Sequence, residues 1–316
     1  MLNHKILILI VGVIVFMDVL QALDSNTPLL RFNPNNCGIS GVFRKFLEFP
    51  NLVVEAEALK ERGGLVWKRP NTYDTQFPHT WHTFKAKNTS GDEVEFIIKD
   101  IPRNRYNEVV DLMALYTLRY KPIYKTLSLW SDADAVKYLK KQWGLVLQQQ
   151  MSVACFRNDG SDDIIGINIL AVQRKDDVMY KLLPSVESYN LRVLFGFMRD
   201  LYEFDLFGHY KVDEFLGSFG IGIDPKYANF GIDAEFLKIR QEICRNFGIK
   251  LTSTIFTSPE SNALANDIHF KMDKGLSFAK MHEVIPEFPY VNRWGMALRS
   301  IHFGKKTNRY NYSTFK

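Results

Sequence analysis

The sequence predicts an α/β domain with a mixed central sheet and helices on both faces. Three observations lead to this prediction. Short apolar runs with strand-like alternation recur from residue 65 onward, and amphipathic segments with helical spacing separate them. Turns rich in Asp, Gly and Pro mark the boundaries. Apolar residues make up 46% of the 316 residues, which is enough for a sizeable core.

The charge pattern does not indicate a nucleic-acid partner. The formal net charge is +5, and Lys and Arg are scattered along the chain instead of forming a basic block. We therefore expect a solvated, mildly basic surface.

Residues 1–22 resemble a secretory signal peptide. Lys5 precedes twelve uncharged residues at 6–17, and the small residue Ala22 follows. The apolar run is too short to span a bilayer comfortably. An uncleaved anchor or a wrongly chosen start codon would also explain these residues. The expected localisation is the secretory pathway if the segment is removed, and membrane-anchored or cytoplasmic otherwise. Pro, Gly and Asn in residues 23–64 predict an irregular extension with a short helix at 52–62, before a domain at 65–316.

The three cysteines do not form a disulfide framework, because they are few and odd in number. Cys155 and Cys244 lie in apolar settings, which predicts buried free thiols, and Cys37 lies in the extension. Asn88 and Asn311 begin sequons that accept glycans only in the secretory pathway.

The sequence of the first half of the domain predicts an edge strand, a further strand, two helices and a hairpin. The alternating run PHTWHTF at 78–84 predicts an edge strand with an aromatic face. A further strand is expected at 94–98, and Pro102 opens a helix that reaches about Leu118. A second helix is expected at 130–150, capped by Ser131 or Asp132. The hairpin strands are expected at 151–157 and 164–172.

The second half predicts alternating helices and strands. Residues 185–206 have the pattern of one helix or two. Ser258 is the expected N-cap of a helix that follows a strand at 250–256. Closing strands are expected at 276–284 and 297–303.

The stretch from Phe215 to Arg240 is the candidate cofactor site. An apolar strand at 215–223 stops at Asp224-Pro225, and helical spacing begins at Ile232. A strand that runs through a tight turn into a helix directs free N–H groups and the positive end of the helix dipole at one point. Such a point binds phosphate.

This strand, turn and helix resemble the acyl-coenzyme A loop of GNAT-type N-acetyltransferases, which reads Q/R-x-x-G-x-G/A. Gly231 matches the family loop, Ala228 replaces Gln or Arg, and Asp233 replaces a small residue. The resemblance implies acetyl-CoA as cofactor. The residues it assigns to cofactor binding are Ile223, Ala228, Asn229, Phe230, Gly231, Ile232, Asp233 and Asn262.

Further motifs are similar to a group of insect arylalkylamine N-acetyltransferase-like proteins. They are N-x-x-A from Asn262 to Ala265, the strand KLTSTIF, and the segments VWKRP, HTWHTF and IPRNRYNEVVDLM. The resemblance covers residues 65–303. It implies a mixed sheet in the order of that family and an insertion over the substrate side at 185–206.

Acyl transfer to an amine needs a base for the amine, a donor for the thioester oxygen and a proton for the departing thiolate. The resemblance places an acid at His269, seven residues after Asn262, where relatives often carry Tyr. The candidate bases are Glu108 and Asp111, with Asp213 and Glu214 as alternatives. A surface histidine and solvated carboxylates are the competing structural interpretations.

No metal site is expected. His79 and His82 lie three residues apart, but no Cys or further His completes a ligand set at suitable spacing. The motifs of P-loop proteins, serine hydrolases and zinc proteases do not occur.

Three functional hypotheses follow. The first is an acyl-CoA-dependent N-acyltransferase that transfers an acetyl group directly to a small amine, with no nucleic-acid partner and no stable membrane partner. The second is a secreted binding protein of the same fold that has lost acetyl-CoA binding, because Ala228 supplies no side-chain donor and Asp233 would repel phosphate. The third is a membrane-anchored enzyme that faces the cytosol.

Overall fold

The computed structural model describes residues 65–71, 76–177, 183, 185–277, 279, 282–283 and 294–303. The predicted signal peptide, the extension at 23–64 with its helix, Cys37 and the Asn311 sequon lie outside the described residues. No helix within the described ranges is long and apolar enough to cross a membrane.

The described strands form one mixed sheet in the order β1-β2-β3-β4-β5-β6-β8-β7. Their bounds are β1 Thr80–Lys87, β2 Glu93–Asp100, β3 Val153–Arg157, β4 Ile164–Arg174, β5 Glu214–Ile223, β6 Leu251–Phe256, β7 Lys271–Ser277 and β8 Trp294–His302. Every neighbouring pair is antiparallel except β5 and β6, which are parallel. The predicted edge strand is confirmed, because β1 ends the sheet.

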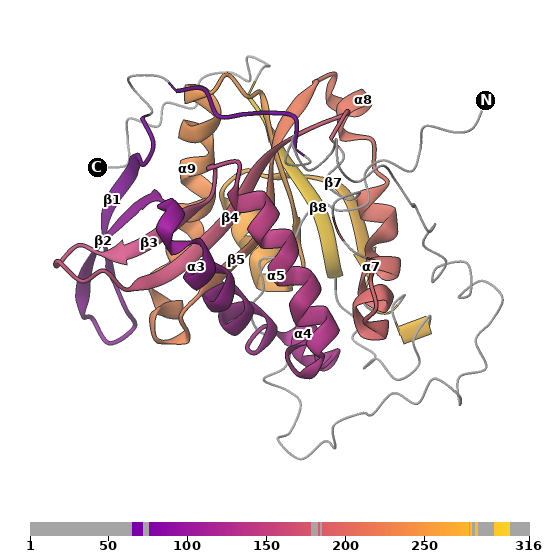
Figure 1. The fold of residues 1–316 in the computed structure, drawn as a ribbon, viewed down its shortest axis with the longest axis horizontal. Coiled ribbons are helices and arrows are strands. Elements are labelled where there is room, and N and C mark those ends of the chain that lie inside the picture. The colour runs from indigo at the N-terminus through magenta and orange to yellow at the C-terminus, as the bar shows by residue number, and fades with distance from the viewer. Residues whose placement is uncertain are drawn as a thin grey trace.

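Helices cover both faces of this sheet (Figure 1). Their bounds are α3 Tyr106–Met113, α4 Pro122–Thr126, α5 Ala133–Leu147, α7 Tyr189–Tyr202, α8 Leu206–Tyr210, α9 Ile232–Asn246 and α10 Pro259–Asp267. Shorter turns are η3 Arg103–Arg105, the π-helical turn η4 Ala114–Leu118, η5 Leu129–Ser131 and η6 Pro225–Phe230. The predicted α/β class with a mixed sheet is confirmed.

Two apolar clusters form the core, one on each face. On the first face, α3, α5 and α7 bury side chains such as Trp143 against Ile167 and Phe219 of the sheet. On the second face, α9 buries Phe236 against the sheet. The fit there is close, because a Cβ on Gly166 would lie 3.1 Å from the Phe236 ring. The sheet is therefore covered on both faces, as its long apolar strands require.

Side-chain caps fix the starts of several helices. Asp132 accepts a hydrogen bond from the Ala135 N–H and so begins α5, as predicted. Ser258 and Ser261 form a reciprocal capping box at the start of α10, which confirms that Ser258 is an N-cap.

Two predicted elements differ from the structure. The strand expected at 276–284 is β7 at Lys271–Ser277, and residues 279 and 282–283 are helical. β7 is an edge strand with exposed side chains, including Met272 at 50%, so its apolar alternation is weak. The single helix expected from Pro102 to Leu118 consists of η3, α3 and η4 in succession, and the separate helix α4 follows it.

Both described cysteines are free and buried, which confirms that prediction. Burial raises the pKa of the Cys155 thiol and of the Cys244 thiol. Neither side chain is therefore a reactive thiolate.

A buried polar network ties α9 to the middle of the sheet. Arg240 is fully buried, and its Nε and Nη2 donate to Oδ1 of Asn168 at 3.3 and 3.1 Å. Nδ2 of Asn168 donates to Ser218 Oγ and to the Gly220 carbonyl, both at 2.9 Å. Burial lowers the pKa of Arg240 to about 9. Asn168 thus links a buried cation on α9 to β5.

We expect Asn168→Leu to lower the free energy of unfolding by about 3 kcal/mol, because it leaves the buried guanidinium without its acceptor. Arg240→Met should cost less alone, and it should recover part of the loss when combined with Asn168→Leu. Urea denaturation of the four proteins measures this cycle. Simple additivity of the two losses would show that the pair is not coupled.

Candidate functional site

The parallel strands β5 and β6 separate early. They pair only at Leu216 with Thr252 and at Gly217 with Ser253. β4, in contrast, pairs with β5 along its whole length, as far as Ile223. The β6-facing main-chain groups of residues 218–223 therefore lack a ladder partner in β6. An opening at the carboxyl ends of parallel strands is where open α/β sheets bind ligands.

A bulge in β5 lies within this opening. Ile169 pairs with Gly220 and Leu170 pairs with Ser218, so Phe219 is an extra residue. Gly220 has a φ of 132°, which favours glycine. The Phe219 carbonyl accepts a hydrogen bond from the buried indole Nε1 of Trp143 on α5 at 3.0 Å. The bulge thus redirects the main chain at the point where the two strands separate.

The segment from β5 through η6 to α9 forms the strand, tight turn and helix that the sequence predicts. The Asp224 carboxylate accepts from the Lys226 N–H at 3.0 Å and starts η6. Gly231 has a φ of 68°, and α9 begins at the next residue. Asn229 and Gly231 are exposed. A ligand can therefore reach the first turn of α9, where N–H groups have no intrahelical acceptor.

Asp233 lies at the second position of α9. Its Oδ1 accepts from the Ala234 N–H at 3.0 Å. Burial raises the pKa of the Asp233 carboxyl, while the Ala234 hydrogen bond and the charge of Lys121 oppose that rise. The carboxylate therefore uses one of the main-chain donors that a bound anion would use.

The π-helical turn η4 packs against the end of β5. A Cβ on Gly222 would lie 3.0 Å from Met113 Sδ and 3.1 Å from Tyr116 Cβ. This packing brings the turn after η4, which carries Lys121, to the start of α9. The Lys121 side chain is buried, and burial lowers its pKa to about 7 while the charge of Asp233 opposes the change.

Comparison with known proteins identifies the family. The protein designated arylalkylamine N-acetyltransferase 7 of the yellow fever mosquito Aedes aegypti is 30% identical, with a TM-score of 0.66; the match covers 75% of this chain and 99% of that one. The chain belongs to the GNAT-type N-acetyltransferase superfamily.

Other solved structures share the fold of this GNAT domain. Arylalkylamine N-acetyltransferase 2 of Aedes aegypti and a mosquito arylalkylamine N-acetyltransferase-like protein 5b are each 15% identical, with TM-scores of 0.56 and 0.53. Each match covers 66% of this chain and 99% of the other. No family model and no curated protein matches the sequence.

His269 of the GNAT domain lies between α10 and β7. It is exposed, has a φ of 67° and follows the last turn of α10. Its role as the acid remains a prediction.

The candidate bases are exposed or half-buried and ion-paired. Glu108 pairs with Arg105, and Asp111 lies 2.6 Å from Lys140 Nζ. Asp213 and Glu214 precede or begin β5, at the end opposite the loop, and pair with Lys175 and Arg174. A carboxylate that acts as a base needs desolvation, so these surroundings give the predicted roles no support.

The Asn262 side chain is buried and makes two hydrogen bonds within the protein. Its Oδ1 accepts from Arg299 Nε at 2.7 Å, and its Nδ2 donates to the Ser258 carbonyl at 2.9 Å. These bonds hold α10 against β8. Cofactor binding by Asn262 remains a prediction, and in this structure its polar atoms face α10 and β8.

His79, just before β1, and His82, within β1, lie among aromatic side chains at the edge of the sheet. The ring of His82 stacks on Phe84 at 5.6 Å, and its Nε2 lies 3.4 Å from the Glu235 carboxylate. Among the described residues, no three His, Cys, Asp or Glu side chains form a group that could hold a metal ion.

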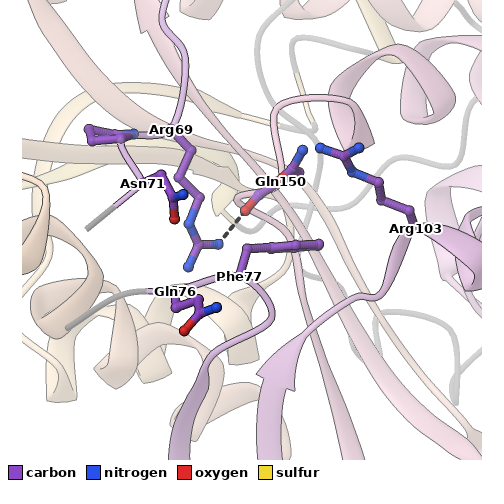
Figure 2. Close-up of a pocket in the computed structure, with 7 residues that line it drawn as sticks. Arg69, Asn71, Gln76, Phe77, Arg103 and Gln150 are labelled. Atoms are coloured by element: carbon purple, nitrogen blue, oxygen red, sulfur yellow. Dashed lines mark hydrogen bonds between the residues drawn. The ribbon is translucent and has the colours of Figure 1, made fainter. Parts of the chain in front are cut away.

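A separate cavity of about 450 Å³ has no residue of the β5–α9 connection in its lining, and Figure 2 shows the residues that line it. Its lining residues are Arg69, Pro70, Asn71, Gln76, Phe77, Arg103 and Gln150. Arg69 donates to the Gln150 carbonyl at 2.6 Å and lies 2.7 Å from the buried Asp100 carboxylate. Because Asp100 already balances this guanidinium, the cavity is a weaker anion site than its two arginines suggest.

Sequence reasoning missed Lys121, because a single lysine before a proline has no periodicity that marks it as buried.

We expect Lys121→Met to stabilise the domain by roughly 3 kcal/mol near pH 6.5, where the wild-type lysine is charged and buried. Between pH 7 and about 10.5, the folded lysine has lost a proton that the unfolded chain keeps, so wild-type stability should rise with pH. The advantage of Lys121→Met should therefore shrink by pH 9.5. Urea denaturation at three pH values measures it, and a constant difference would contradict the assignment.

Proposed function

We propose that this GNAT domain is an acyl-CoA-dependent N-acyltransferase that transfers an acetyl group directly to a small amine. One observation carries the proposal: β5 and β6 separate after Gly217 and Ser253, and α9 begins at the same edge with an exposed first turn. Membership of the superfamily supports it. The designations of related structures, which include arylalkylamine and agmatine N-acetyltransferases, support a small amine as acceptor.

The main chain of the site fits an acyl-CoA. The first N–H groups of α9 suit a diphosphate, and the unpaired edge of β5 at 218–223 suits the amides of an extended arm. The bound cofactor would supply the acyl group and a thiolate leaving group. In this proposal, β5 orients the thioester beside the bulge, and Trp143 fixes the Phe219 carbonyl at that point.

Two observations on the loop favour a second function. The Asp233 carboxylate already bonds the Ala234 N–H, and Ala228 supplies no side-chain donor. A binding protein of this fold that has lost acetyl-CoA would have such a loop. The two functions differ in a direct measurement of cofactor binding.

We expect acetyl-CoA to give a saturable isotherm in isothermal titration calorimetry, and Asp233→Asn to tighten binding about tenfold by removing a like charge. Asp134→Asn is the matched control, because Asp134 holds the same second position in α5, another 15-residue helix. It should leave binding unchanged. If neither the wild type nor Asp233→Asn binds at millimolar acetyl-CoA, the enzyme proposal fails and the second function stands.

We also propose that residues 1–22 are a cleaved signal peptide, followed by an extension at 23–64 and the acyltransferase domain at 65–316. Expression in insect cells should then yield secreted protein whose intact mass lacks residues 1–22. Recovery of the full mass from the cell fraction would instead favour an uncleaved anchor or a cytoplasmic protein.

A further inference from the structure

Lys121 is a buried cation without a side-chain partner among the described residues. It lies between η4 and α4, with 9% of its surface exposed. Its main-chain N–H donates to the Thr117 carbonyl at 2.9 Å, while its ammonium group makes no hydrogen bond or ion pair within the part of the chain that the structure describes. A lysine with nine-tenths of its surface buried and no ion pair is costly, because lysines are rarely buried without a partner. A ligand that supplies the missing anion would explain why a lysine is tolerated here.

The packing of η4 directs Lys121 to the β5–α9 loop. A Cβ on Gly222 would lie 3.4 Å from Thr117 Cγ2, and Lys121 follows Thr117 by one helical turn. Tyr116 on the same turn donates to the Ile164 carbonyl at 3.2 Å, beside the end of β5. π-Helical turns are frequent at functional sites.

Asp233 is the charged group that acts on Lys121, and Lys121 acts in turn on Asp233. The N-terminus of a helix carries roughly half a positive charge. The Asp233 carboxylate, bound to the Ala234 N–H, cancels that charge, and the Lys121 ammonium restores it. When Lys121 is protonated, the first turn of α9 together with Lys121 is therefore net positive, although Asp233 alone would repel an anion.

We propose that Lys121 is the cation that binds the diphosphate of an acyl-CoA at the first turn of α9. It supplies the positive donor that Ala228 lacks, and its ammonium shifts from Asp233 toward the diphosphate when the ligand binds. The ligand class is a nucleoside diphosphate ester, and the inference rests on the proposed function.

The test is calorimetric titration of the full chain with CoA, ADP and pantetheine. Lys121→Met should weaken CoA and ADP about ten- to hundredfold, which is the range for losing one charge-assisted hydrogen bond. It should leave pantetheine, which has no phosphate, unchanged. Lys121→Arg should retain most of the affinity. Lys125→Met, an exposed lysine one turn further along α4, is the matched control and should have no effect.

A second background separates binding of the diphosphate from neutralisation of Asp233. If Lys121 contacts the diphosphate, Lys121→Met weakens CoA in the Asp233→Asn background as well. If the loss disappears in that background, Lys121 only neutralises Asp233 and the proposal is wrong. Circular dichroism and thermal melts at pH 7 should show that Lys121→Met is folded and at least as stable as the wild type.

The remaining outcomes distinguish this inference from the proposed function. Equal binding of CoA by the wild type and Lys121→Met overturns the role of Lys121 and leaves the acyltransferase proposal intact. If Asp233→Asn binds CoA, and neither the wild type nor the double variant of Asp233→Asn and Lys121→Met does, the role of Lys121 is supported. The wild type would then have lost the cofactor. No binding by any variant overturns both.

Discussion

The early separation of β5 from β6 is the constraint on which the rest of the site depends. β4 holds β5 along its full length, and β8 holds β6 along its full length. The opening between them is therefore maintained by two paired portions of the sheet, and not by loops. Buried main-chain groups need partners, so the unpaired edge of β5 must be satisfied by side chains, water or a ligand. Trp143 does this at Phe219.

Charge at the start of α9 determines what the opening can accept. A helix N-terminus ordinarily favours anions, but here an internal carboxylate competes for the same donors. Lys121 reaches this point from the first layer of helices, on the opposite side of β5 from the body of α9. Two elements from different layers therefore set the electrostatics at the start of α9, and the packing of η4 on Gly222 positions one of them.

The elements predicted best from sequence were those with local causes. The turn at Asp224-Pro225, the start of α9 at Ile232 and the caps at Asp132 and Ser258 each depend on residues a few positions apart. Elements that depend on distant partners were predicted poorly. β7 is defined by its pairing with β8, and its exposed side chains show little alternation.

The candidate site residues also differ according to whether their positions depend on local sequence or on distant partners. The loop from Asn229 to Asp233 lies where the sequence predicts it, because a strand, a tight turn and a helix are visible in the chain itself. The candidate role of His269 depends on counting from Asn262, and counting does not show that His269 follows the last turn of α10 with a positive φ. The burial of Lys121 depends on η4 packing against β5, which is a contact between distant segments.

The two buried thiols have a consequence for the chemical robustness of the folded domain. Cys155 faces the second cluster from β3, and Cys244 faces it from α9, and neither forms a disulfide. Protonated and shielded from solvent, they do not react readily with glutathione or an oxidoreductase. The described part of the folded domain is therefore held together without a covalent cross-link between these cysteines. Its native packing depends on neither the oxidation nor the reduction of the two thiols.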